Sequence, residues 1–182
     1  MRGLSRRRRP GMGGADFHQR DAMKGFLMIK MLTGAAVAAL ALTGVAAAQD
    51  YGLSPSYGSI SLRAGFTPDP YTVSLQSGGS INASNSIGGS CRGYIANAPD
   101  FRVQYSSGSF PLIISVASSS DTTLVVNGPD GRWYCDDDGG DGLNPSLNFG
   151  SPQSGQYDIW VGTYGGSSLQ NATLYISELY SQ

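Results

Sequence analysis

Apolar side chains recur at every second position through much of the chain after residue 48. The segments 101–105 and 112–116 each place an apolar residue at alternate positions, with other residues between them. This period of two predicts strands that bury one face, because successive side chains of a strand point to opposite sides. No apolar series with the helical period of 3.6 follows Ala48. Further strand candidates lie at 59–62, 71–75, 92–95, 122–127, 132–135, 147–149, 157–161 and 174–176.

Turn residues separate these strands closely. Leu124–Val126 and Ile159–Val161 are short β-branched and aromatic runs, and clusters of Gly, Pro, Asn and Asp bound them at 127–131 and 150–155. Many short strands with frequent Gly and Ser turns indicate an all-β protein. We predict a single-domain antiparallel β-sandwich, similar to a jelly roll. The polar stretch 77–89 is predicted to be a flexible connection within it.

The N-terminal quarter has a different composition. Residues 1–22 form a basic preface, either an interaction or export segment or the product of a start codon assigned too early. Residues 23–48 match a secretory signal peptide, with Lys24 and Lys30 before an apolar run that ends at Ala46-Ala47-Ala48. A membrane anchor is the alternative, but it needs about 20 strongly apolar residues. We expect cleavage after Ala48 and a periplasmic or secreted protein without a stable membrane span.

Cleavage changes the charge of the protein. The chain has 12 basic and 13 acidic residues, of which eight and two respectively precede Gln49. The exported part then carries 4 − 11 = −7 charges, which excludes a nucleic-acid partner because such binding depends on cationic contacts to phosphates. His18 is the one histidine of the sequence and precedes the cleavage site. Without histidine, Ser-His-Asp and Cys-His catalysis and His-based metal sites are excluded from the exported part.

Both cysteines of the sequence, Cys91 and Cys135, fall in the exported part. Two cysteines in an exported chain favour a disulfide over free thiols. A metal site made of two cysteines and a catalytic thiol are weaker alternatives, since the thiol lacks a histidine base.

An acidic loop with two glycines, 136–141, is the place where charge converges along the sequence. One interpretation is a solvated turn whose carboxylates repel one another. The other is a Ca²⁺ site, because Ca²⁺ takes six to eight oxygen ligands from flexible loops and the Gly139-Gly140 pair allows the loop to curl. A pair of carboxylates for glycoside hydrolysis is a weaker third reading. The candidate Ca²⁺ ligands are Asp136, Asp137, Asp138, Asp141 and Asn144, with Asp121 and Asp130 from neighbouring turns.

Four aromatic residues near this loop are candidates for stacking on a sugar or peptide: Trp133, Tyr134, Trp160 and Tyr164. Trp160 and Tyr164 point away from the face that Ile159 and Val161 occupy, if the segment is a strand. The alternative, which we favour, is that these aromatic side chains pack in the core of the sandwich.

The order D-T-T-L-V-V, P-D-G, D-D-D and S-G-Q-Y-D-I-W-V-G resembles the bacterial pre-peptidase C-terminal (PPC) domain. The resemblance covers about the last half of the chain, so 91–182 would be the PPC-like part and 49–90 would supply the N-terminal strands of the same sandwich. It implies an exported β-sandwich module that is often associated with calcium.

Together these features predict an exported, non-catalytic binding or accessory module. Its partner would be an unknown extracellular or periplasmic polymer or protein. The alternatives are a peptidase-associated protein or hydrolase, and a structural protein of the cell envelope.

Overall fold

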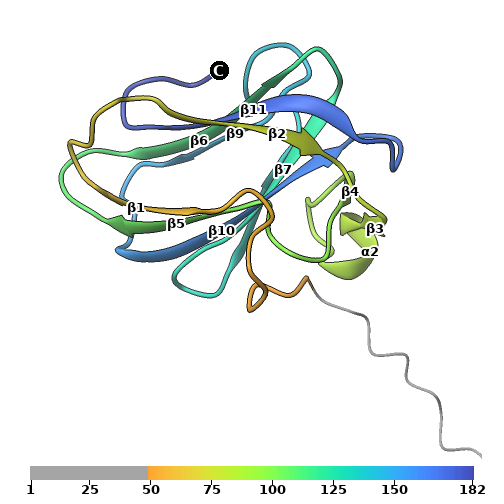
Figure 1. Cartoon of the computed structure of the whole chain (residues 1–182), viewed down its shortest axis with the longest axis horizontal. Coiled ribbons are helices and arrows are strands. Elements are labelled where there is room, and N and C mark those ends of the chain that lie inside the picture. The colour runs from red at the N-terminus through yellow and green to blue at the C-terminus, as the bar shows by residue number, and fades with distance from the viewer. Residues whose placement is uncertain (1–48) are drawn as a thin grey trace, which may run out of the picture. The chain divides into compact units, whose positions relative to one another are not determined.

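The computed structural model describes residues 49–182, which fold into two β-sheets packed face to face (Figure 1). The predicted preface 1–22 and signal peptide 23–48 lie outside the described residues. Within residues 49–182, no helix is long and apolar enough to cross a membrane. The all-β sandwich predicted from the alternating pattern is confirmed.

The larger sheet contains seven strands, and the long strand β10 lies at its centre, paired with β5, β7 and β4. The pair β1–β5 is parallel, while the other strand pairs of both sheets are antiparallel. The strands of the larger sheet are β1 (Ser59–Arg63), β3 (Ile81–Asn82), β4 (Tyr94–Ile95), β5 (Phe101–Ser106), β7 (Thr122–Asn127), β8 (Trp133–Asp136) and β10 (Gly155–Thr163). Those of the smaller sheet, in spatial order, are β2 (Tyr71–Ser77), β11 (Gln170–Ser177), β6 (Leu112–Ser118) and β9 (Ser146–Phe149).

The main core lies between the two sheets and is built from the predicted alternation. In β5, Phe101, Val103 and Tyr105 are buried, whereas the residues between them face outward. Strand β6 departs from this pattern, since its first five residues are all buried. The C-terminal residues run across its outer face, where the Gln182 amide donates to the Ser115 hydroxyl at 3.1 Å. A strand covered on both faces buries consecutive side chains, so alternation alone does not predict it.

A second, smaller apolar cluster covers the outer face of the larger sheet. Val125 and Trp160 of the sheet form this cluster with Ala83, Cys91 and Ile95 from segment 78–97. We call this segment the cover. Its short strand β3 pairs with β4, and β4 pairs with the end of β10.

The cover corrects the predicted flexible connection at 77–89. This stretch contains strand β3 and the short helix α2 (Ala83–Ser86). The Asn82 side chain begins the helix by accepting hydrogen bonds from the amides of Ser84 at 3.0 Å and Asn85 at 3.3 Å. Asn and Ser are common both in loops and at the N-termini of helices. Composition alone therefore did not distinguish the short helix from a flexible connection.

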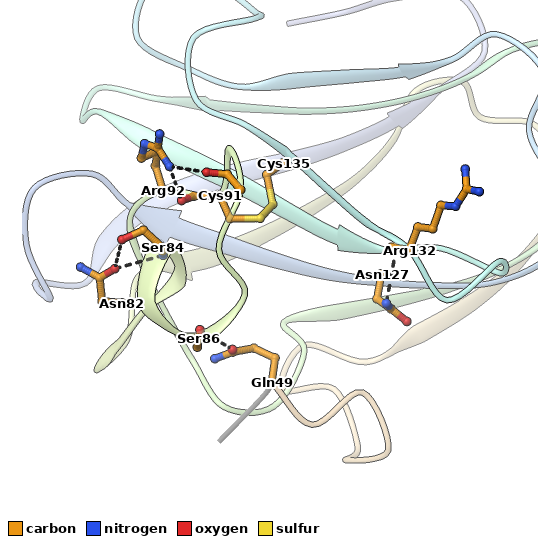
Figure 2. The surroundings of a disulfide bond; sticks show 10 residues. Gln49, Asn82, Ser84, Ser86, Cys91, Arg92, Asn127, Arg132 and Cys135 are labelled. Atoms are coloured by element: carbon orange, nitrogen blue, oxygen red, sulfur yellow. Dashed lines mark hydrogen bonds between the residues drawn. A yellow bond between two sulfur atoms is a disulfide. The ribbon is translucent and has the colours of Figure 1, made fainter. Parts of the chain in front are cut away.

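The disulfide between Cys91 and Cys135 joins the cover to strand β8, as predicted (Figure 2). It closes a loop between residues 44 positions apart. Beside it, the Arg92 guanidinium donates to the carbonyls of Gly89 at 3.0 Å and Cys91 at 2.9 Å, which holds the turn around the cysteine.

The residues that follow Ala48 are held against the same side of the molecule. The Gln49 side chain accepts a hydrogen bond from the Ser86 hydroxyl at 2.9 Å (Figure 2). Arg102 forms a 2.5 Å ion pair with the buried Asp158 and donates to the backbone carbonyls of Tyr51 and Leu53. This guanidinium therefore links the N-terminal segment to the two central strands β5 and β10.

Asp100 is a buried carboxyl group directly before β5, and the sequence offered no sign of its burial. One of its oxygens accepts the Val161 amide at 2.7 Å. Burial raises the pKa of Asp100 to about 7, although the Val161 hydrogen bond acts in the opposite direction. The folded protein thus binds this proton more tightly than the unfolded chain does.

We predict that replacing both cysteines, Cys91→Ala with Cys135→Ala, lowers the free energy of unfolding by about 4 kcal/mol in the chain-entropy description. Urea unfolding of the wild type and the double variant measures this difference. A reducing agent should destabilise the wild type and leave the double variant unchanged. Equal stability of the two proteins without reductant would contradict the prediction.

The raised pKa of Asp100 predicts that this group makes the fold less stable as pH rises from about 4 through about 7, by at most about 1.4 kcal/mol per pH unit. Asp100→Asn keeps an oxygen for the Val161 amide and removes the titration. The variant should match the wild type near pH 4 and melt at a higher temperature at pH 8. A constant difference across this range would show that Asp100 does not titrate there.

Candidate functional site

The acidic loop lies at one end of the sandwich, where β8 ends, β7 begins and β10 ends. Backbone hydrogen bonds join these segments. The Thr122 amide donates to the Leu143 carbonyl at 3.2 Å, and the Tyr164 amide donates to the Asp121 carbonyl at 3.1 Å. The structure therefore brings Asp121 to the acidic loop, as the sequence suggested.

Asp136 holds the loop in its curled form. Its Oδ2 atom accepts the amides of Gly139 and Ser146, each at 2.8 Å. These donors lie on opposite sides of the loop, so one carboxylate closes it. A carboxylate that accepts two backbone N–H groups stabilises a turn without any metal ion.

Asn144 is engaged in the same way. Its Oδ1 accepts the Thr122 hydroxyl at 2.7 Å, and its Nδ2 donates to the Ser118 carbonyl at 3.0 Å. The Asn144 backbone also bonds to Gly140 at 2.9 Å and to Asp141 at 3.2 Å. The side chains of two predicted ligands, Asp136 and Asn144, thus already form hydrogen bonds with other groups of the protein.

Asp121 is the exception among these groups. Its Oδ1 is buried and has no hydrogen-bond partner. Burial is the main cause that raises its pKa, and the negative charges of Asp138 and then Asp137 add to it. These three carboxylates therefore lie near enough to repel one another.

The remaining predicted ligand, Asp130, does not belong to this group. It lies in the turn between β7 and β8, whereas Asp121 directly precedes β7, so the length of a strand separates them. Its carboxylate accepts the Tyr134 hydroxyl at 2.8 Å and the Arg132 amide at 3.0 Å. The strand predicted at 122–127 already lies between these two residues, so this separation could have been inferred from the sequence.

The seven predicted ligands thus do not converge on one position. Among residues 49–182, no group of three or more His, Cys, Asp or Glu side chains is arranged to hold a metal ion. Among the predicted ligands, the carboxylates that accept no hydrogen bond belong to Asp121, Asp137, Asp138 and Asp141. Calcium binding stays a prediction, with a smaller set of ligands than the sequence suggested.

The four aromatic candidates have different environments. Trp160 has no exposed area, and its ring packs against Trp133 at 5.3 Å between centroids, so Trp160 is a core residue and offers no surface for stacking. Tyr134 packs edge-to-face on Phe149 at 5.0 Å. Tyr164 differs from them, because 48% of it is exposed.

Sequence reasoning missed two exposed apolar residues. Leu143 is 58% exposed and lies two residues after the acidic loop, and Leu169 is 56% exposed in the turn after Tyr164. An apolar residue within a Gly- and Ser-rich turn, outside any alternating series, is the signal that would have pointed to them.

No family model and no curated protein matches the chain. Among solved structures, it is similar to the periplasmic lysozyme inhibitor PliG of Aeromonas hydrophila, an inhibitor of g-type lysozyme. The two are 16% identical, the alignment covers 65% of this chain and 96% of that chain, and the TM-score is 0.33. Similarity at this level assigns neither a function nor a partner to the chain. The resemblance to PPC domains gains no support from these comparisons.

Asp136 as a Ca²⁺ ligand and Asp136 as the acceptor that closes the loop predict different effects of its removal on stability. Because its oxygen accepts two amides, we predict that Asp136→Ala lowers the free energy of unfolding by about 2 kcal/mol even in the presence of a chelator. Asp138→Ala is the matched control, since repulsion between carboxylates favours its removal, and it should leave stability equal or higher. Chemical unfolding in chelator measures both, and equal effects of the two substitutions would contradict the assigned role.

Proposed function

We propose that the protein is an exported, non-catalytic binding module that recognises a basic surface on another protein. The contact is made by the acidic end, defined here as Asp121, Asp137, Asp138, Asp141, Leu143 and Tyr164. The net charge of −7 after residue 48 and the disulfide, which is typical of oxidising compartments, support an exported module with a cationic partner.

The observation that carries the proposal is the pairing of exposed apolar side chains with uncompensated carboxylates. Leu143 and Tyr164 are attached through backbone hydrogen bonds to Thr122 and Asp121, so they lie on either side of the start of β7. The two ion pairs found within residues 49–182, Arg102–Asp158 and Arg132–Asp130, involve no carboxylate of the acidic end. Protein interfaces combine an apolar or aromatic centre with complementary charge, which is what this end offers.

The peptidase-associated and hydrolase alternatives receive less support. Residues 49–182 contain no histidine to serve as a base for a serine or cysteine nucleophile. The one carboxyl group whose pKa is raised to about 7, Asp100, lies in the interior and not in a cleft. A structural role in the envelope stays an alternative, and it predicts that the protein sediments with envelope fractions.

We also propose calcium as an alternative ligand that competes with the basic partner for Asp121, Asp137, Asp138 and Asp141. The loop must close around the ion to bind it, because these carboxylates of the described residues do not form a metal-holding group as they stand. The buried, unpaired Oδ1 of Asp121 supports calcium as a ligand, because a cation would compensate this oxygen and the charges around it. Asp136 and Asn144 would then shape the loop from behind instead of binding the ion.

We predict that Tyr164→Ser abolishes capture of the partner, whereas Phe110→Ser does not. Both residues are 48% exposed, but Phe110 lies between β5 and β6, on a different loop from the acidic end. The assay is affinity capture at low ionic strength from the periplasmic and extracellular fractions of the host, followed by repetition at high salt. A basic protein retained by the wild type and the Phe110 variant alone, and released by salt, is the expected result.

Equal capture by both variants would show that the acidic end is not the contact. Capture that is indifferent to salt would remove the electrostatic part of the proposal, since attraction between exposed charges is screened.

The calcium proposal has a separate test. For a site with a dissociation constant on the order of 10⁻⁴–10⁻³ M, millimolar Ca²⁺ should raise the melting temperature by a few degrees, and Mg²⁺ should do less. The variant Asp137→Asn with Asp138→Asn should lose this response and keep its stability in chelator. A wild-type melting temperature that is the same with chelator and with ten millimolar Ca²⁺, roughly ten times the weaker constant, would leave only a solvated turn.

A further inference from the structure

A small cavity of about 50 Å³ lies away from the acidic end, between the β7–β8 turn and the loop that leads into β10. Tyr134 from β8 and Tyr157 from β10 reach it from the larger sheet, and Phe149 from β9 reaches it from the smaller one. Pro129 and Pro152 complete its apolar wall, and Asp130 is the carboxylate in its lining. We call it the aromatic pocket.

The three rings of the aromatic pocket hold one another in place. Phe149 packs edge-to-face with Tyr134 at 5.0 Å and with Tyr157 at 5.4 Å between ring centroids. Tyr157 is 1% exposed, and its hydroxyl donates to the Gln153 carbonyl at 2.9 Å. Such mutually packed rings form a pocket that exists before any ligand arrives, which lowers the cost of binding.

The carboxylate of Asp130 is equally well positioned. It accepts the Tyr134 hydroxyl at 2.8 Å and the Arg132 amide at 3.0 Å, so one ring of the pocket also orients the charge. These hydrogen bonds, the first of them above all, lower the pKa of Asp130, a carboxyl group that is ionised at neutral pH in any case. The negative charge of Asp130 attracts a cation, and the electron-rich faces of the neighbouring rings add to this attraction.

We propose that the aromatic pocket binds the end of a lysine side chain from a partner protein. The terminal methylenes of lysine lie along the rings of Phe149 and Tyr134, and its ammonium reaches Asp130. This site is independent of the acidic end, so either proposal can fail without the other.

The size of the pocket selects this occupant. A volume of about 50 Å³ is a few times the roughly 10–15 Å³ that a cavity needs to hold one water molecule, and far below the roughly 300–1,000 Å³ of a small-molecule pocket. It admits the slim end of one side chain and not a whole metabolite. The planar, forked guanidinium of arginine is broader than an ammonium, so lysine fits better.

Arg132 already lies near the carboxylate and competes with an incoming cation. Its Nε is 3.7 Å from Asp130 Oδ2, but 80% of the Arg132 side chain is exposed. Such an exposed ion pair contributes little and is easily displaced. Removing Arg132 should therefore strengthen the binding of lysine, whereas an ordinary structural ion pair would show no such effect.

The experiment is an NMR titration of the full protein, disulfide intact, with Nα-acetyl-lysine amide, while the ring resonances of Phe149 and Tyr157 are followed. Nα-acetyl-norleucine amide tests the charge, and Nα-acetyl-arginine amide tests the shape. We expect saturable shifts with lysine at a dissociation constant on the order of millimolar, which is typical of a single side chain. Norleucine should give no saturation, and arginine should bind more weakly.

Three variants complete the test. Asp130→Asn should weaken lysine binding roughly threefold or more, and Arg132→Gln should strengthen it by a similar factor. Asp50→Asn is the matched control and should change nothing, because Asp50 also accepts the amide two residues ahead, that of Gly52 at 2.9 Å, but lies outside the pocket. Ring shifts that norleucine reproduces, binding that Asp130→Asn leaves unchanged, or no saturable shift with lysine would each overturn the proposal.

Discussion

The burial of strand β10 on both of its faces is the constraint on which the rest of the structure depends. Ile159 and Val161 face the smaller sheet, while Trp160 lies under the cover on the opposite face, and none of the three is exposed. A strand in this position requires partners on both edges and apolar layers on both sides. Strands β5 and β7 supply the edges, and the second sheet and the cover supply the layers. The candidate sites lie at the ends of this same strand: Tyr157 lines the aromatic pocket near its start, and Tyr164 follows its last residue.

The cover shows how a small exported domain completes such a core. Segment 78–97 contains two strands of two residues and a helix of four, and such short elements have little stability of their own. Their position is maintained by apolar contact with Trp160 and by the covalent link between Cys91 and Cys135. The disulfide restricts the unfolded chain between these residues, which favours the folded arrangement in which the cover protects β10.

Charge and apolar surface are distributed so that the two proposed sites have different character. The acidic end combines carboxylates without arginine partners with exposed Leu143 and Tyr164, which suits a broad basic surface on a protein. The aromatic pocket has one oriented carboxylate, that of Asp130, in a preformed cavity, which suits a single cationic side chain. Both features agree with a module that binds cationic partners, and neither requires a catalytic group.

From the sequence alone, the alternating pattern determined most strand positions, the all-β class and, with the two cysteines, the disulfide. These properties are local or depend on composition, since the period of two is a direct result of strand geometry. Tertiary structure alone decided that Asp136 and Asn144 have protein partners and that 77–89 is part of a cover. It also assembled the aromatic pocket from three strands of two sheets. Whether a side-chain oxygen is free depends on donors from other strands, such as the Thr122 hydroxyl for Asn144, 22 positions away, and an alternating pattern carries no information about them.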